Sequence, residues 1–143
     1  RRAVLFANAY SIPGTPVSVP ADPVAKDPSG GFLTAAYKDG FAVGQSAFDK
    51  PAMAVKSGVA NTLGLRGWFE RLGTRRFYLG GASMGGNIVM ALIEQHPDAF
   101  AGAMSAWYAF GALGLYSLAP GRPDYVVGVP LAESATIAMP GAM

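Results

Sequence analysis

A serine enclosed by glycines is the feature of this sequence best suited to chemistry. Ser83 stands at the centre of Gly81-Ala82-Ser83-Met84-Gly85, after an apolar run at 76–79 and before an apolar helical pattern at 87–95. Between a strand and a helix, G-x-S-x-G predicts a nucleophile elbow. The elbow glycines Gly81 and Gly85 leave room for a strained serine backbone. The serine oxygen would then lie beside the helix amides, where a developing negative charge is favoured.

A nucleophilic serine needs a base to take its proton, and this chain has a single histidine. His96 follows Ser83 by 13 residues, at the far end of the next expected helix. A rise of 1.5 Å per residue separates the two by about 19 Å, whereas proton transfer needs hydrogen-bond reach, about 3 Å. We therefore interpret His96 as a residue that ends a helix beside Pro97, and not as the base for Ser83.

The acid of a catalytic triad is also unassigned by the sequence. Asp98 lies beside His96, at the wrong end of the helix. Asp124 and Glu133 come later in the chain, in a weakly patterned tail, and Asp124 fits a turn aspartate better than a catalytic one. Asp49 follows an expected strand and could face the carboxyl edge of the sheet, although an ordinary polar loop residue is the favoured interpretation.

Composition excludes several other classes of protein. The chain has 143 residues, of which 51% are hydrophobic and 14% charged, so one domain with a buried core is expected. The net charge of +2 comes from scattered side chains without a basic run, which gives no support for nucleic acid binding. No uninterrupted apolar stretch of about 18 residues predicts a membrane span.

Metal and disulfide chemistry find little support in the residue types. The chain has no cysteine and one histidine, and its carboxylates are dispersed. Disulfides and thiolate metal sites are therefore excluded, and we expect neither a metal enzyme nor a cofactor. The compartment stays open between secreted or periplasmic and cytoplasmic, as does the oligomeric state. Because the first residue is Arg1, we expect a processed or excerpted chain.

The elements that would position Ser83 alternate along the chain. Strands are expected at 3–7, 41–46, 76–79 and 101–106, and helices at 32–39, 52–72 and 87–95. This alternation predicts an α/β fold, a mostly parallel sheet flanked by helices. In the helix at 52–72 the expected apolar stripe is Val55, Val59, Leu63, Trp68 and Leu72. The loop at 13–31, rich in Pro and Gly, is long for a plain connection, and we expect it to border the site.

Beyond residue 106 the pattern weakens. Residues 107–118 are apolar with glycine and proline nearby, 120–123 suggest a turn, 125–129 a strand, and 132–143 are weakly patterned. We expect residues 1–106 to form the core, with the elbow at 81–85. Residues 107–143 would be a divergent or truncated tail of the same domain.

These residues together resemble the α/β-hydrolase superfamily, in particular esterase-like members related to feruloyl esterases and polyester depolymerases. The resemblance covers about residues 3–106. It is carried by Tyr-Leu-Gly-Gly-Ala-Ser-Met-Gly-Gly-Asn at 78–87, His-Pro-Asp at 96–98, Phe100, Tyr-Ser-Ile-Pro-Gly at 10–14 and the strand at 41–46. It implies a partial α/β-hydrolase fold and the hydrolysis of small-molecule carboxylic esters.

The resemblance also implies roles for single residues. Ser83 would be the nucleophile, and the backbone N–H of Met84 would be one oxyanion-hole donor. The second donor would be the N–H of Tyr10, since Asn8-Ala9-Tyr10 stands where the family usually has His-Gly-x. The family's acid and histidine come after later strands. We therefore expect this chain to be the amino-terminal part of a serine hydrolase, lacking the triad histidine.

A nucleotide-binding domain and an inactive binding module are the alternatives to a serine hydrolase. A nucleotide-binding domain would need G-x-G-x-x-G, but Ala82 or Ser83 occupies the third position, and no lysine is near for a Walker loop. The remaining alternative is a catalytically inactive binding module on a hydrolase scaffold. The absence of a His-Gly pair and of a second histidine favours that alternative.

Overall fold

The computed structural model describes residues 1–105, 114–117, 125–129 and 134. Its contacts divide the chain into two compact units, Arg1–Trp107 and Tyr108–Met143. In the second unit, β5 (Leu115–Ser117) and β6 (Tyr125–Val127) pair antiparallel. The expected strand at 125–129 is thus present but ends at Val127. The assignment of 107–143 to the same domain as the core stays a prediction.

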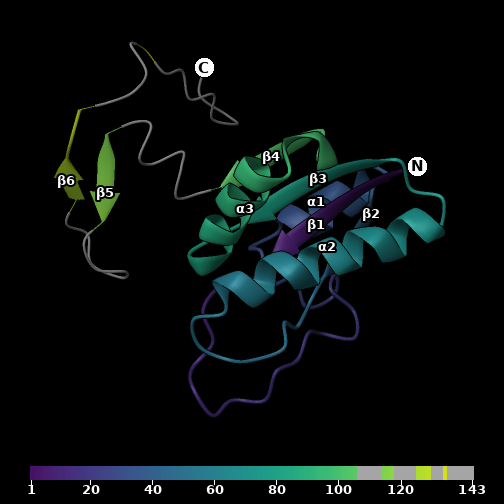
Figure 1. Ribbon diagram of the computed structural model, residues 1–143, viewed down its shortest axis with the longest axis horizontal. Coiled ribbons are helices and arrows are strands. Elements are labelled where there is room, and N and C mark those ends of the chain that lie inside the picture. Colours follow the sequence, from purple (N-terminus) through teal and green to yellow (C-terminus); the bar gives the residue numbers. More distant parts are fainter. Residues whose placement is uncertain (106–113, 118–124, 130–133, 135–143) are drawn as a thin grey trace. The chain divides into compact units, whose positions relative to one another are not determined.

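The first unit is a four-stranded parallel sheet with helices on both faces (Figure 1). Its strands are β1 (Arg2–Ala7), β2 (Ala42–Gln45), β3 (Arg76–Gly81) and β4 (Gly102–Ser105), in the order β2-β1-β3-β4. Its helices are α1 (Phe32–Lys38), α2 (Val55–Arg71) and α3 (Met84–Gln95), followed by the 3-10 turn η1 (Pro97–Ala99). The predicted α/β fold class and the order of elements are confirmed.

β1 is buried on both faces, as expected for a central parallel strand. Ala3, Leu5 and Ala7 pack with residues of α2 and α3, whereas Val4 and Phe6 pack with Leu33 of α1. The nearly all-apolar α3 lies inside, with Ile88, Val89 and Leu92 fully buried. The core therefore consists of two layers, one on each face of the sheet.

The predicted apolar stripe of α2 is wrong at its carboxyl end. Trp68 and Leu72 are 49% and 50% exposed. The buried residues are instead Gly58, Thr62 and Phe69. Gly58 packs against α3, where Ile88 fills the space that a side chain would need: a Cβ on Gly58 would lie 3.1 Å from Ile88 Cγ1.

The helix ends follow the predicted signals. Gly40 and Gly73, just past α1 and α2, have φ of 80° and 86°, a conformation that glycine adopts without strain. α3 ends before Pro97, as expected, but begins at Met84, three residues earlier than the apolar pattern indicated. Among the described residues, none of the helices combines the length and the apolar character needed to cross a bilayer.

Candidate functional site

Ser83 occupies a strained turn between β3 and α3. Its backbone angles are φ 54° and ψ −128°, in a region that residues with side chains rarely adopt. The turn is closed by hydrogen bonds from Gly85 N to Ala82 O and from Gly86 N to Ser83 O, each 2.9 Å. Ser83 is exposed, at the carboxyl edge of the sheet. The turn therefore holds Ser83 in a strained conformation between the end of β3 and the start of α3.

Both elbow glycines are required because no side chain would fit at their positions. A Cβ on Gly81 would lie 2.6 Å from the carbonyl carbon of Gly85 and 2.9 Å from Val89 Cγ2. A Cβ on Gly85 would lie 2.7 Å from the carbonyl carbon of Ala7. Because real Cβ atoms do not approach other atoms so closely, no side chain fits at either position. The glycines let the start of α3 lie directly against the end of β1.

The loops after β1 and β2 are tied together at this edge of the sheet. Asn8 Nδ2 donates to Ser46 O over 2.7 Å. Farther along the same loops, Ala52 N donates to Ser11 O over 3.0 Å in an isolated antiparallel bridge. The segment that follows β1 is thereby held beside the segment that follows β2.

Met84 and Tyr10, the residues predicted to donate to an oxyanion, differ in their surroundings. Met84 begins α3, its side chain is buried, and its Sδ accepts a hydrogen bond from Ala54 N over 3.2 Å. Its own N–H belongs to the first turn, whose amides have no intrahelical partner. Tyr10 lies in the loop after β1, with 46% of its surface exposed. The roles of both amides stay predictions.

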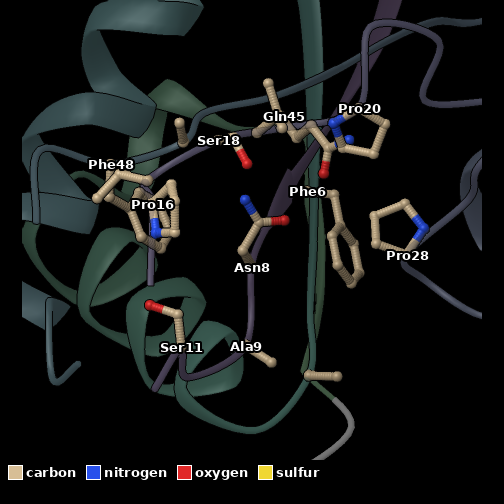
Figure 2. Close-up of a pocket in the computed structure, with 14 residues that line it drawn as sticks. Phe6, Asn8, Ala9, Ser11, Pro16, Ser18, Pro20, Pro28, Gln45 and Phe48 are labelled. Atoms are coloured by element: carbon tan, nitrogen blue, oxygen red, sulfur yellow. The ribbon is translucent and has the colours of Figure 1, made fainter. Parts of the chain in front are cut away.

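A pocket of about 240 Å³ opens beside the elbow (Figure 2). Ala82, the residue before Ser83, is part of its wall. The wall carries no charged side chain, and combines apolar residues with neutral polar ones. It is formed by Phe6, Asn8, Ala9, Ser11, Pro16, Val17, Ser18, Val19, Pro20, Pro28, Gln45, Ala47, Phe48 and Ala82.

The long loop lines this pocket through residues 16–20 and Pro28. It is anchored by Asp27, whose carboxylate accepts hydrogen bonds from Thr34 N and Thr34 Oγ1, both 2.8 Å, and from Ser29 N, 2.8 Å. Partial burial raises the pKa of Asp27, but the hydrogen bonds from Ser29 and Thr34 outweigh it and lower the pKa from 3.8 to about 2. Asp27 thus joins the loop to the first turn of α1.

The other titratable candidates do not gather around Ser83. His96 follows the last residue of α3, so the 12 residues of that helix place it about 18 Å from the elbow. Asp98 lies beside it in η1, and Asp49 is exposed in the loop after β2. Asp124 and Glu133 lie outside the described residues. Within the described part of the chain, no three His, Cys, Asp or Glu side chains come together as metal ligands would.

Sequence reasoning did not identify Gln45 as a polar residue of the pocket. Gln45 ends β2, and both polar atoms of its side-chain amide are buried without a hydrogen-bond partner. The sequence alone indicates only that Gln45 belongs to the strand expected at 41–46. Its position on the last residue of a parallel strand, at the edge where sites form, was the available signal.

The fold is shared with a solved lipolytic enzyme. A structure reported for LipS and LipT, two metagenome-derived lipolytic enzymes, aligns with a TM-score of 0.51 at 20% identity. The alignment covers 84% of this chain and 50% of that one. This chain therefore spans about half the length of that enzyme, with which it has a parallel α/β fold in common.

Comparisons of the sequence with family models and with curated proteins say less about this chain than the structural comparison does. Residues 98–143 match the catalytic domain of glycosyl hydrolase family 92. That match covers less than half of the chain, excludes Ser83, and falls largely outside the described residues. No curated protein is significantly similar to the sequence.

Proposed function

We propose that this chain carries the nucleophile of a serine hydrolase that acts on small-molecule carboxylic esters, with Ser83 as the nucleophile. The observation that carries the proposal is the strained backbone of Ser83, φ 54° and ψ −128°, on a strand-to-helix turn. A strain of this kind costs about 1–3 kcal/mol and persists where the surrounding structure demands it. At Ser83 it presents a hydroxyl at the carboxyl edge of the sheet, beside a helix amino end.

In the proposed reaction, Ser83 Oγ attacks the ester carbonyl carbon while its proton passes to a base. The carbonyl oxygen becomes an oxyanion, stabilised by the N–H of Met84 and the N–H of Tyr10. The C–O bond to the alcohol then breaks, the alcohol leaves with a proton, and water hydrolyses the acyl-serine. The close approach of Gly85 to Ala7 supports this arrangement, since it brings the loop after β1 to the first turn of α3.

The base is a residue other than His96. About 18 Å of helix separates that histidine from the elbow, far beyond hydrogen-bond reach. The ester specificity rests on the esterase-like resemblance of residues 78–87, and the lipolytic activity of the structural neighbour is consistent with it. Because the chain spans half of that neighbour, the activity of the whole protein is part of the proposal.

Labelling with a fluorophosphonate probe tests the nucleophile directly. The intact gene product should form a covalent adduct on the peptide that contains Ser83, located by mass spectrometry. Ser83→Ala should abolish the adduct, whereas Ser57→Ala, a serine in α2, should leave it unchanged. A folded protein that takes up no label, or label that survives Ser83→Ala, would overturn the proposal.

A catalytically inactive binding module is the second candidate. The position of His96 favours it, since the single histidine of the sequence cannot serve Ser83. The two candidates differ in one outcome: a module binds small esters in the pocket beside Ala82 without turnover or labelling, whereas the hydrolase forms the acyl-serine and releases alcohol.

A further inference from the structure

The strands begin, and two helices end, at the edge of the sheet opposite Ser83. Because the sheet is parallel, the connecting helices return antiparallel to the strands, so α1 and α2 end where the strands begin. The carbonyl of Arg1 accepts hydrogen bonds from Arg75 N over 3.1 Å and from Arg76 N over 3.4 Å, which joins the start of β1 to the start of β3. Figure 1 shows the chain end marked N beside the carboxyl end of α2.

Basic side chains gather at this edge. Arg2 and Arg76 are register partners in β1 and β3 and therefore lie side by side. Lys38 and Arg71 occupy the last turns of α1 and α2, where the helix dipole favours a cation. Folding thus creates a basic surface that the order of the sequence does not show. All six residues of this basic edge are exposed: Arg1, Arg2, Lys38, Arg71, Arg75 and Arg76.

The carboxylates of this edge leave that charge in place. Glu70 forms its ion pair, 3.0 Å, inside α2, and no other ion pair occurs within the described part of the chain. Arg2 donates to the backbone carbonyl of Asp39 over 3.5 Å and not to its carboxylate. Glu94 and Asp98 come at the end of α3 and in η1, before β4. An anionic partner would supply the counter-charge that the basic edge lacks among the described residues.

Two exposed apolar side chains belong to the same surface. Trp68 and Leu72 are four residues apart at the end of α2, share one of its faces, and are each about half exposed. Arg71 is three residues after Trp68, and Arg1 Nη1 lies 3.5 Å from Leu72 O, so arginines flank the apolar pair. A partner that covers this surface must therefore offer apolar contact as well as negative charge.

An anionic phospholipid surface has both properties. Its phosphates match guanidinium groups, which bind them through paired N–H donors. Tryptophan and leucine beside basic residues are typical of segments that lie at the boundary between headgroups and acyl chains. A nucleic acid would match the charge, and a base would stack on Trp68, but it would leave the aliphatic Leu72 uncovered. The apolar pair therefore favours the lipid surface.

We propose that the basic edge, together with Trp68 and Leu72, docks this chain on an anionic phospholipid surface. The inference is independent of the proposed hydrolase activity, since none of these residues belongs to the elbow or lines the pocket beside it. Ser83 lies at the opposite edge of the sheet. A docked chain therefore presents the elbow to the surrounding water and not to the lipid.

Binding to vesicles tests the proposal on the unsubstituted full chain. Vesicles of phosphatidylcholine and phosphatidylserine, about 3:1, are pelleted with the protein in about 0.1 M NaCl, beside vesicles of phosphatidylcholine alone. The anionic vesicles should carry the protein into the pellet, and the neutral ones should not. Raising NaCl to about 0.5 M should weaken binding at least about fivefold, because salt screens exposed charges. Equal pelleting with both kinds of vesicle, or none with the anionic ones, would overturn the proposal.

A pair of double variants locates the surface. Arg75→Gln with Arg76→Gln removes two charges of the basic edge and should weaken binding about ten- to thirty-fold. Lys50→Gln with Lys56→Gln is the matched control: these exposed lysines lie after β2 and in the first turn of α2, at the opposite edge. The control should weaken binding less than about threefold, and equal losses would contradict docking through this edge. If the arginine variant does not fold, the vesicle and salt comparison of the unsubstituted chain decides.

Trp68 reports whether the contact reaches the acyl chains. Trp107→Phe leaves Trp68 as the single tryptophan of the sequence. Lipids brominated on their acyl chains should quench its emission, and Trp68→Ser should weaken vesicle binding about three- to ten-fold. Unquenched emission from protein that pellets with the vesicles would contradict this docking. Tighter binding to a single-stranded oligonucleotide than to the anionic vesicles would assign the basic edge to nucleic acid instead.

Discussion

Gly85, in the first turn of α3, lies against the last residue of β1, so that a Cβ in its place would be 2.7 Å from the carbonyl carbon of Ala7. The same atom would be 2.9 Å from the carbonyl oxygen of Asn8. The neighbours are backbone atoms, which cannot rotate away as a flexible side chain can. This contact fixes the distance between the turn that carries Ser83 and the loop that carries Tyr10.

Gly85→Ala should therefore destabilise the fold strongly. An added methyl group in a packed interior costs about 1–3 kcal/mol, and we expect the upper part of this range because backbone must move. Chemical unfolding of the purified variant measures the loss. Gly64→Ala is the matched control: Gly64 is exposed in α2 with nothing within 4 Å of an added Cβ. That change should stabilise by about 0.5–1 kcal/mol, and equal effects of the two would refute the packing explanation.

Ser83→Gly should raise the stability of the protein relative to Ser83→Ala. Glycine adopts φ 54° and ψ −128° without the steric cost that serine or alanine carries there. We expect a difference of about 1 kcal/mol in the free energy of unfolding, after the greater flexibility of glycine in the unfolded chain is subtracted. Thermal unfolding of both variants measures it. An alanine variant as stable as the glycine variant would show that the turn is unstrained.

The strained turn and its sheet are the parts of this structure that the sequence predicts well. Five consecutive apolar residues at 3–7 predict a strand buried on both faces, and β1 is one. The glycines around Ser83 predict a positive φ at the serine, because they leave free the space that side chains at their own positions would occupy. Each of these signals is local, so it can be read without knowledge of distant contacts.

Features that depend on distant segments were not predicted. The buried face of α2 includes Gly58 and Thr62, which a search for large apolar side chains does not select. Gly58 is covered by Ile88, which belongs to another helix. Gln45 likewise lines a pocket together with residues 16–20, which come from the loop before α1. Such residues become recognisable only once the partner element is placed.

Asp27→Asn should loosen the loop that borders the pocket. The carboxylate of Asp27 accepts hydrogen bonds from the N–H and hydroxyl of Thr34 and from Ser29, and an amide accepts fewer. We expect a loss of about 1 kcal/mol at pH 7, the usual cost of losing a side chain that caps a helix. Asp49→Asn, an exposed carboxylate in the loop after β2, should change stability by less than about 0.5 kcal/mol.

The same substitution should change the acid dependence of stability. The pKa of Asp27 is lower in the folded chain, about 2, than its ordinary value of 3.8. Its ionised form therefore stabilises the fold above pH 3.8, and this contribution is lost as the pH falls towards 2. The unfolding free energy of Asp27→Asn should decline less steeply than that of the unsubstituted chain over this interval. Parallel pH profiles would show that Asp27 is not linked to folding.

Arg66 should be more important to stability than its surface ion pair suggests. Its guanidinium lies 4.9 Å from the ring centre of Phe77, and its Nε donates to Ala99 O over 2.9 Å. It thereby joins α2 to β3 and to the turn after α3, while its ion pair with Glu70, 3.0 Å, stays within α2. We expect Arg66→Ala to cost about 2 kcal/mol, through lost packing, cation–π contact and hydrogen bonding.

Glu70→Ala separates these contributions, because it removes the ion pair and leaves the contacts of Arg66 with Phe77 and Ala99. It should cost at most about 0.5 kcal/mol, as exposed pairs four residues apart in a helix do. Arg66→Lys should recover little of the loss, since an ammonium lacks the planar fork that bonds a carbonyl while lying over a ring. Urea unfolding of the three variants gives the ranking, and a Glu70→Ala loss as large as that of Arg66→Ala would assign the effect to the ion pair.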